Sequence, residues 1–301
     1  MDLYLPIAGM SVNALVIVLL GAGVGFLSGM LGVGGGFLTT PLLIFYGVPP
    51  AVAVASSATQ ITGASVSGAL AHARRKGVDF KMGAVMVAGG LAGSVAGSFL
   101  FELLQALGQI DTTISIVYVL MLLSIGGLML RDSVRALRPR ATPRAAPRRH
   151  NRLVAALPWR VRFYRSGLYI SPIAPFLLGL AVGILTVIMG IGGGFILVPA
   201  MIYLLGMAAS VVVGTSLFQI LFVTAATTLL HATQSKTVDI VLAALLLVGG
   251  VIGAQYGASA ARRLPAEKLR LVLALVVLAF GIRLALQLTY RPGEIFTVDP
   301  A

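Results

Sequence analysis

The chain has 301 residues, of which 58% are hydrophobic and only 10% charged, and its mean hydropathy is +1.00. Such a chain cannot cover its surface with polar groups, which excludes a water-soluble globular protein and predicts an integral membrane protein. The formal net charge of +13 comes largely from one Arg-rich stretch. Cysteine is absent from the sequence, which excludes disulfides, thiolate metal sites and relays through a cysteine.

Apolar segments follow one another along the chain, five in each half. They span about 13–31, 36–47, 50–72, 81–104 and 112–130, and then about 172–190, 194–206, 208–231, 238–260 and 268–288. Most have the ~20 residues that a helix needs to cross ~30 Å of hydrocarbon. The first 73 residues contain no Lys or Arg, so the basic start of a cleaved signal peptide is missing. We therefore expect the first apolar segment to be retained.

The second segment of each half is too short for a straight membrane-spanning helix. Each has about a dozen residues, which make ~18 Å of helix. Each follows a triple glycine and carries a proline, Pro41 or Pro199, within its first turn or so, where a missing N–H costs little. We expect two short or broken helices, and the sequence leaves open whether they fully cross the membrane.

The two halves carry the same pattern. Residues 25–41 read GFLSGMLGVGGGFLTTP, and residues 183–199 read GILTVIMGIGGGFILVP. Farther along, Ser-Ser-Ala-Thr-Gln at 56–60 is matched by Thr-Ser-Leu-Phe-Gln at 215–219. This duplication predicts a membrane protein built from two repeats, with its chemistry near their interface.

The loop charges predict that the second repeat is inverted. In the first half the loop at 74–81 is basic and the next loop, around Glu102 and Asp111, is acidic. In the second half the basic loop, 262–270, is the equivalent of the acidic one. Basic loops stay in the cytoplasm. The expected fold is an all-α polytopic protein of the cell inner membrane, with two inverted-topology repeats and both termini outside the cytoplasm.

These boundaries divide the chain into four parts. We expect a first membrane repeat at 1–130, an Arg-rich cytoplasmic linker at 131–171, a second membrane repeat at 172–290 and a C-terminal tail at 291–301. Nothing beside the linker resembles a nucleic-acid module, so we expect its eleven Arg to lie on anionic lipid headgroups and not to bind nucleic acid. Within it, residues 153–164 could form a short interfacial helix.

The triple glycines are the first candidate binding elements. They are Gly34, Gly35 and Gly36, and Gly192, Gly193 and Gly194. An isolated motif of this kind usually serves helix packing or a kink. Its repetition before a short segment predicts a break at membrane depth, where backbone N–H groups and the helix dipole suit an anion. Glycine also lets a ligand approach the backbone without meeting a Cβ.

Polar side chains on the third segment of each half form the second candidate set. They are Ser56, Ser57, Thr59 and Gln60, and Thr215, Ser216 and Gln219. Residues three or four apart share a helix face, so the hydroxyls and the amide can converge. Polar glue between helices is the alternative. Because a buried primary amide has four hydrogen-bonding positions, a bound oxyanion could take its two donors, and we expect substrate contact here.

The remaining features are structural in our interpretation. Glycines recur every four residues at 89–97 and 249–257, which predicts close helix packing. His72 and His231 are expected at the membrane interface, with a proton-linked role as the alternative. Away from their ends the apolar segments have no charged residue, so a cation would lack a counter-charge and a catalytic carboxylate pair is missing.

Several motifs of the chain resemble those of the sulfite exporter TauE/SafE family. They are the glycine motifs, the segments that end in Gln60 and Gln219, and the histidine and glycine positions after them. The family is also called the toluene sulfonate uptake permease family. The resemblance covers nearly the whole chain except the Arg-rich linker and the tails. It implies a permease that moves small sulfur-containing anions, such as sulfite, sulfoacetate or aromatic sulfonates, across a bacterial inner membrane without ATP.

We therefore expect a secondary transporter that works by alternating access, needs no cofactor or metal, and is not an enzyme. A passive anion channel, and a membrane scaffold or insertion protein that binds a protein partner, are the alternatives. The sequence leaves open which anion is moved, in which direction, with which coupling ion, and whether the protein forms a homo-oligomer.

Overall fold

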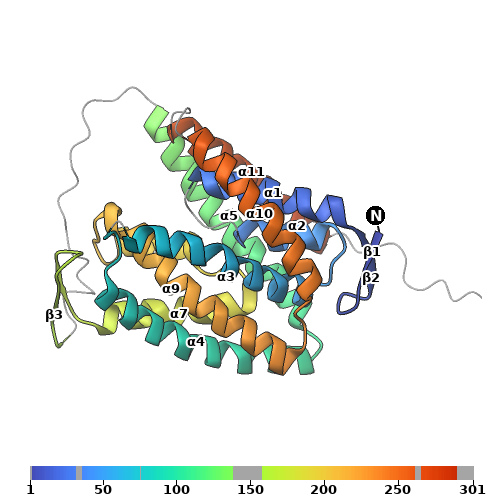
Figure 1. Ribbon diagram of the computed structural model, residues 1–301, viewed down its shortest axis with the longest axis horizontal. Coiled ribbons are helices and arrows are strands. Elements are labelled where there is room, and N and C mark those ends of the chain that lie inside the picture. Colours follow the sequence, from blue (N-terminus) through green and yellow to red (C-terminus); the bar gives the residue numbers. More distant parts are fainter. Residues whose placement is uncertain (1, 32–35, 75, 138–157, 262–265, 290–301) are drawn as a thin grey trace, which may run out of the picture.

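The computed structural model describes residues 2–31, 36–74, 76–137, 158–261 and 266–289. These residues form ten α-helices, one π-helical turn and two antiparallel β-hairpins, which confirms the predicted all-α polytopic fold (Figure 1). The interfacial helix expected at 153–164 is wrong for its last residues. Val161–Phe163 is a strand, because alternate side chains there are buried and exposed; residues 153–157 lie outside the described part.

The elements occur in the same order in the two halves. The first half contains β1 (Asp2–Leu5), β2 (Met10–Asn13), α1 (Ala14–Leu31), α2 (Gly36–Phe45), α3 (Pro50–Arg74), α4 (Phe80–Ala106) and α5 (Ile110–Leu137). The second half contains β3 (Val161–Phe163), β4 (Leu168–Ile170), α7 (Ile173–Met189), α8 (Gly194–Tyr203), α9 (Ala209–Leu230), the π-helical turn η1 (His231–Ser235), α10 (Ile240–Ala261) and α11 (Ala266–Thr289). Each half thus begins with a hairpin and places its shortest α-helix second.

Helix lengths agree with a membrane protein. Five described helical segments are long and apolar enough to cross a bilayer: Phe80–Ala106, Ile110–Arg131, Val211–Ser235, Ile240–Gly257 and Leu271–Thr289. By contrast, α2 and α8 have 10 residues each. Ten residues make ~15 Å of helix, about half of the ~30 Å hydrocarbon core. The two short helices predicted after the glycines are confirmed.

Close packing joins helices of different halves. In the first such pair, α10 lies against α1, and its glycine stripe faces the α1 backbone. A Cβ at Gly249 would lie 2.0 Å from the Val18 carbonyl oxygen, and one at Gly253 would lie 2.0 Å from the Ala22 carbonyl oxygen. These distances leave no room for a side chain. Because both contacts advance along both helices together, α1 and α10 run in the same direction.

The second pair, α4 and α7, repeats this arrangement. A Cβ at Gly89 would lie 2.1 Å from the Phe176 carbonyl oxygen, and one at Gly93 would lie 2.1 Å from the Leu180 carbonyl oxygen. These helices also run in the same direction. The close packing predicted for the glycine stripes is confirmed, and the neighbour in each case belongs to the other half of the chain.

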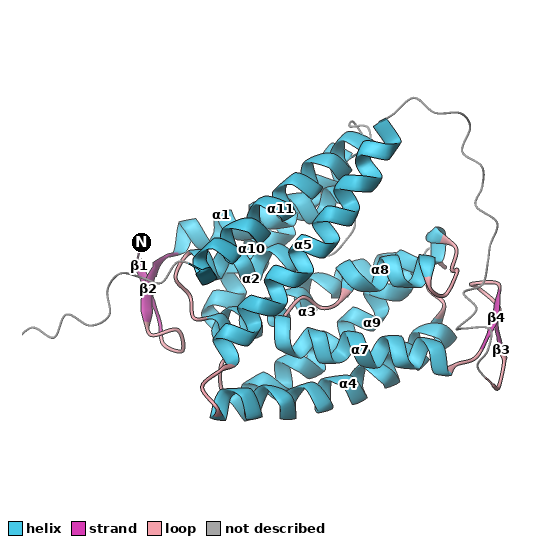
Figure 2. Cartoon of the chain, turned by 180° about the vertical axis from the view of Figure 1, so that it is seen from behind, coloured by secondary structure: helices cyan, strands magenta, loops and turns pink. Residues whose placement is uncertain are grey.

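The two copies of the element order run in opposite directions. α3 and α10 begin side by side, because the Asp239 N–H lies 3.2 Å from Ser56 Oγ. In the same way α9 and α4 begin side by side, because the Asp79 N–H lies 3.0 Å from Thr215 Oγ1. A short turn reverses the chain between α3 and α4, so these are opposite ends of the molecule. The hairpins β1–β2 and β3–β4 also lie at opposite ends (Figures 1 and 2). The sidedness of these ends in the membrane stays a prediction from the loop charges.

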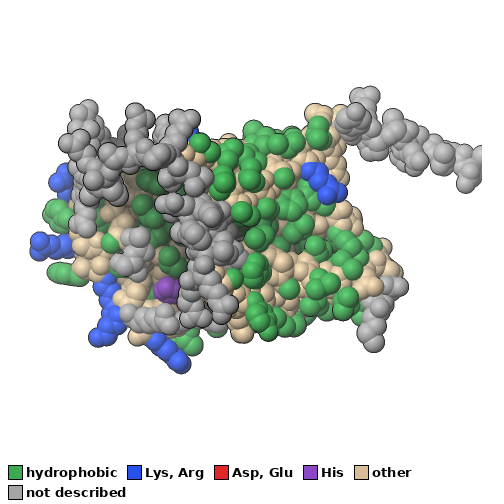
Figure 3. All heavy atoms as spheres, turned by 90° about the horizontal axis from the view of Figure 1, so that it is seen from above, with side chains coloured by type: hydrophobic (Ala, Val, Ile, Leu, Met, Phe, Trp, Pro, Cys, Tyr) green, Lys and Arg blue, Asp and Glu red, His purple; other side chains and the backbone are tan. Residues whose placement is uncertain are grey.

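One face of the surface is largely apolar. Hydrophobic side chains are spread over the part of Figure 3 that lies away from the β3 end, and most of the Lys and Arg visible there lie toward the β3 end. Large apolar side chains such as Phe99, Leu120 and Leu229 are 62–64% exposed. Lipid is the solvent that suits such a surface.

Candidate functional site

A sharp glycine turn separates α7 from α8. Gly190, Gly192 and Gly193 have φ angles of +67°, +68° and +74°, which is left-handed backbone that favours glycine. The helix therefore stops at Met189 and restarts at Gly194, as the second triple glycine predicts. In the first half, Gly36 is the first residue of α2, whereas Gly34 and Gly35 lie outside the described residues.

The starts of the two short helices meet in the buried core. Phe37 and Phe195 occupy equivalent positions and stack with ring centroids 4.3 Å apart. A Cβ at Gly36 would lie 2.0 Å from Ile61 Cδ1, and a Cβ at Gly192 would lie 2.9 Å from Ile61 Cγ2. The two breaks predicted from the sequence therefore converge on one α3 side chain.

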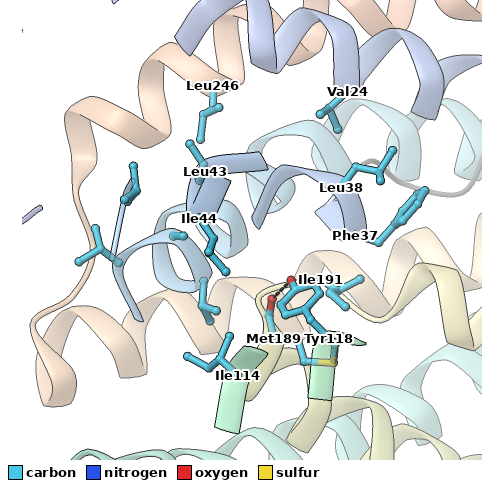
Figure 4. Close-up of a cluster of buried hydrophobic side chains, with 14 of the residues drawn as sticks. Val24, Phe37, Leu38, Leu43, Ile44, Ile114, Tyr118, Met189, Ile191 and Leu246 are labelled. Carbon is cyan, nitrogen blue, oxygen red and sulfur yellow. Dashed lines mark hydrogen bonds between the residues drawn. The ribbon is translucent and has the colours of Figure 1, made fainter. Parts of the chain in front are cut away.

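The carbonyl end of the α7 break is already occupied by side chains. The Met189 carbonyl accepts a hydrogen bond from Tyr118 (Figure 4). It accepts another from the Thr40 hydroxyl at 3.4 Å. The Val187 carbonyl lies 3.0 Å from His231 Nε2. Because a carbonyl can only accept, Nε2 carries the proton. Groups that would attract a cation are thus used within the protein.

His231, expected at the membrane interface, has a buried side chain. It packs edge-to-face on Phe101 at 4.7 Å, and its Nδ1 lies 3.3 Å from Ser235 Oγ. The ring extends from η1 to α7, where it satisfies the Val187 carbonyl near the broken end of that helix. His72 is partly exposed near the end of α3, and its location at the membrane interface stays a prediction.

The amide end of the same break presents unused donors. The N–H groups of Ile196 and Leu197 both donate to the Gly193 carbonyl, at 3.0 and 2.7 Å. Within the described residues, no hydrogen bond is assigned to the N–H groups of Gly194 or Phe195, as is usual for the first turn of a helix. The break therefore offers donors at the positive end of a helix dipole, which favours an anion.

Three threonines that the sequence analysis missed surround this break. Thr186 Oγ1 lies 3.5 Å from the position that a Cβ of Gly193 would take. Thr224 Cγ2 lies 3.0 Å from the position that a Cβ of Gly192 would take. Thr62 donates to Thr224 at 2.9 Å. The repeated sequence pattern could have identified two of these, Thr186 and Thr224.

Their counterparts in the first half are also hydroxyl residues. Ser28 lies 158 positions before Thr186, and Ser65 lies 159 positions before Thr224, the same offsets as the motifs around them.

Each candidate glutamine faces a glycine of the other half. Gln219 Nε2 lies 3.0 Å from the position that a Cβ of Gly90 on α4 would take. Gln60 Nε2 lies 2.7 Å from the position that a Cβ of Gly250 on α10 would take. Gly90 belongs to the crossing of α4 with α7, and Gly250 to the crossing of α10 with α1. The structure therefore places the two glutamines on different helix pairs and does not bring them together.

The glutamine amides are buried with open hydrogen-bonding positions. Gln219 is 0% exposed, and neither Oε1 nor Nε2 has a partner. Gln60 is 5% exposed, and its Oε1 has no partner. Ser57 Oγ, one turn before Gln60, is likewise buried and without a partner. Among the described candidate side chains, these three hold the buried polar atoms that have no hydrogen-bond partner.

The other candidate hydroxyls have partners within the protein. Ser56 and Thr215 accept the N–H groups of Asp239 and Asp79, as described above. Thr59 donates to the Ala55 carbonyl and Ser216 to the Val213 carbonyl, within their own helices. The contacts of Ser56 and Thr215 join different elements and agree with the helix-glue alternative, whereas those of Thr59 and Ser216 stay within one helix.

Two buried aspartates were not singled out by the sequence analysis. Asp79 caps α4 by accepting the Met82 N–H, and its Oδ2 accepts the backbone N–H and the hydroxyl of Ser166 in the second hairpin. Asp239 accepts the Leu242 N–H, and its Oδ2 accepts the Ile7 N–H of the first hairpin. Their spacing of 160 residues was the available signal. Each aspartate ties one hairpin to one helix start.

Two short helices that follow breaks in the chain and meet between packed apolar helices are typical of membrane transporters. The chain belongs to the sulfite exporter TauE/SafE family, whose model matches residues 17–284. This is a family of membrane transporters and not an enzyme family. The protein is accordingly a multi-pass membrane transporter of the cell inner membrane, and the resemblance noted from its motifs is confirmed.

Relatives of similar length carry matching descriptions. The chain is 30% identical over 271 residues to the "Probable membrane transporter protein YjnA" of Bacillus subtilis, which covers 89% of this chain and 98% of that protein. It is 32% identical over 278 residues to a "Probable membrane transporter protein" of Xylella fastidiosa, covering 91% and 95%. No solved structure matches the chain.

Proposed function

We propose that this transporter is a secondary carrier of small sulfur-containing anions, such as sulfite or organosulfonates, and that it works by alternating access. The observation that carries the proposal is the Gln219 amide, which is completely buried with both polar atoms unpartnered. An unpartnered buried polar group costs about 1–3 kcal/mol. A ligand or water that completes these hydrogen bonds would remove that cost, and the family description, sulfite exporter, supports an oxyanion.

Gln219 and the glycine break lie beside the same turn of α7. A Cβ at Gly193 would lie 2.0 Å from Val182 Cγ1. The next residue, Gly183, lies against Gly90, which Gln219 also faces. We call the set formed by Gly192–Gly194, Thr186, Gln219 and Thr224 the Gln219 half-site. One small anion reaching from the break to the amide would contact both.

The Gln219 half-site consists of neutral donors. Backbone N–H groups, hydroxyls and a primary amide can each donate to an oxygen of a sulfite or sulfonate group. None of these groups carries a formal positive charge. Such a site selects an oxyanion while holding it weakly enough to release it, which suits a carrier.

The first half repeats this chemistry on the other helix pair. We call the set formed by Gly36, Ser28, Gln60 and Ser65 the Gln60 half-site, since its members are equivalent to those above. Because the two copies run in opposite directions, rocking of α1 and α10 against α4 and α7 would open the half-sites toward opposite ends of the molecule.

Binding can be tested on purified protein by thermal unfolding. A ligand that binds only the native state raises the unfolding temperature in proportion to its affinity. Sulfite or a small sulfonate should raise it for the wild type, compared with chloride at the same ionic strength, and Gln219→Leu should lose this shift. A full shift in Gln219→Leu would remove the amide from the binding site.

A further inference from the structure

The outer face of the second hairpin combines aromatic and cationic side chains. Trp159, Tyr164 and Tyr169 are 82%, 81% and 57% exposed, and Arg160 and Arg162 are exposed between them. We call these five residues the hairpin face. Arg162 and Tyr169 are directly opposite each other in the β3–β4 register. The face is therefore a small amphipathic surface with aromatic rings around cationic groups.

The inner face of the same hairpin fixes it to the helices. Phe163, Leu168 and Ile170 are 1–6% exposed and pack in a cluster that includes Met82 and Met86 of α4. Alternation of buried and exposed side chains along β3 and β4 is what a strand pair with one covered side requires. The hairpin is thus a rigid part of the bundle and presents one defined outer face.

The hairpin lies level with the start of a membrane span. Arg165 donates to the Val78 carbonyl at 2.8 Å, and its guanidinium lies over the Phe80 ring. Lys81 Nζ lies 3.4 Å from the Arg162 carbonyl oxygen. Phe80 is the first residue of the candidate span Phe80–Ala106. On this basis we infer that the hairpin lies at the depth where hydrocarbon gives way to lipid headgroups.

The hairpin has cationic residues but no acidic ones. Residues 158–172 contain three Arg and no Asp or Glu. The carboxylate of Asp79 beneath the hairpin is buried and bound to Ser166. The equivalent hairpin at the other end, residues 2–13, contains no Lys or Arg at all. The same fold element therefore carries a cationic outer face at one end of the molecule only.

We propose that the hairpin face binds the anionic headgroups of phospholipids at this end of the protein. Arg side chains donate to headgroup phosphates, and Trp and Tyr rings prefer the membrane interface. Basic side chains near an anionic membrane surface each add favourable binding energy. This binding does not depend on the transported substrate, so it stands or falls independently of the proposed transport function.

Trp159 can serve as a fluorescent probe of the hairpin face, since it is the single tryptophan in the chain. The full-length protein is reconstituted into nanodiscs of phosphatidylcholine that contain a fixed small fraction of brominated phosphatidylglycerol or of brominated phosphatidylcholine. Bromine quenches tryptophan only at short range. The proposal predicts that the brominated anionic lipid quenches Trp159 more strongly than the zwitterionic one, and that added salt reduces the difference.

Variants assign the preference to the hairpin face. Arg162→Gln should lower the relative affinity for the anionic lipid about fivefold, which corresponds to about 1 kcal/mol. Arg283→Gln, an exposed arginine that lies over Phe45 near the opposite end, is the control and should leave the preference unchanged. Equal quenching by the two lipids in the wild type, no quenching by either, or equal losses in both variants would overturn the proposal.

Discussion

Phe37 and Phe195 stack with their ring planes 9° apart, although 158 residues separate them in the chain. Because they are equivalent positions of the two repeats, their contact lies where the repeats meet. The glycine turn before Phe195 and the start of α2 before Phe37 are held against each other by this pair. The arrangement of the central breaks thus depends on a contact between two identical side chains.

Removal of one ring should therefore destabilise the whole fold. We expect Phe195→Ala to cost about 3–5 kcal/mol, the usual range for a buried aromatic side chain. Phe99→Ala is the control, since Phe99 is 63% exposed on the apolar surface. Thermal unfolding in one detergent measures both. Equal losses for the two variants would mean that the stacked pair does not join the repeats.

Gly193 should be needed for the space beside it as well as for its backbone conformation. Gly193 and Gly206 both have a φ angle of +74°. A Cβ at Gly193 would lie 2.0 Å from Val182, whereas a Cβ at Gly206 would have no atom within 4 Å. Gly206→Ala should cost about 1–2 kcal/mol for the left-handed conformation alone.

Gly193→Ala should cost more than Gly206→Ala, and it should also lose the thermal stabilisation by sulfite or sulfonate that Gly206→Ala keeps. Unfolding curves with and without the anion separate the two effects. If Gly193→Ala retains the full anion-induced shift, the turn is a structural break and the anion is bound elsewhere.

The two aspartate caps, Asp79 and Asp239, should contribute unequally to the stability of the fold. Asp79 Oδ2 accepts two hydrogen bonds from Ser166, whereas Asp239 Oδ2 accepts one, from Ile7 at 3.3 Å. Each Asp→Ala change removes a helix cap worth about 1 kcal/mol. Asp79→Ala also leaves two buried donors unpaired, at about 1–3 kcal/mol each, so it should lower the unfolding temperature more than Asp239→Ala. The reverse order would contradict the hydrogen bonds described here.

Much of the fold could be predicted from the sequence, because glycine and hydrophobic patterns report on local geometry. The short helices after the triple glycines and the packed glycine stripes followed from such patterns. The partner of each stripe could not be predicted, since the crossing of α4 with α7 joins segments that are far apart in the chain. The hairpins were missed because their strands have three or four residues, too few for a periodic signal.

The sequence singled out Gln60 and Gln219 through their repetition, and both are buried with unpartnered atoms. Contact between these side chains and a substrate stays a prediction. Their separation onto two helix pairs could not be predicted, because spacing within one helix says nothing about which neighbour that helix faces. Thr186 and Thr224 were overlooked, since a hydroxyl residue in an apolar segment is common and only its repeat partner marks it.

The sidedness of the membrane protein can be tested by labelling. The loop charges predict that Lys76 faces the cytoplasm and that Asp2 lies outside. Single cysteines placed at these positions of the cysteine-free chain are exposed to an impermeant maleimide in intact spheroplasts. The cysteine at position 2 should react, and the one at position 76 should react only after lysis. The opposite pattern would reverse the predicted orientation.

Counterflow in proteoliposomes tests the central claim most directly. Vesicles loaded with unlabelled sulfite are diluted into a trace of labelled sulfite, with wild type, Gln219→Leu and Thr228→Val at equal protein density. Thr228 is the control, since its hydroxyl is also buried and unpartnered but belongs to neither half-site. A carrier predicts transient accumulation of label above equilibrium for the wild type and Thr228→Val, and its loss for Gln219→Leu. Label that only equilibrates in the wild type would indicate a channel, and undiminished counterflow in Gln219→Leu would contradict the proposed site.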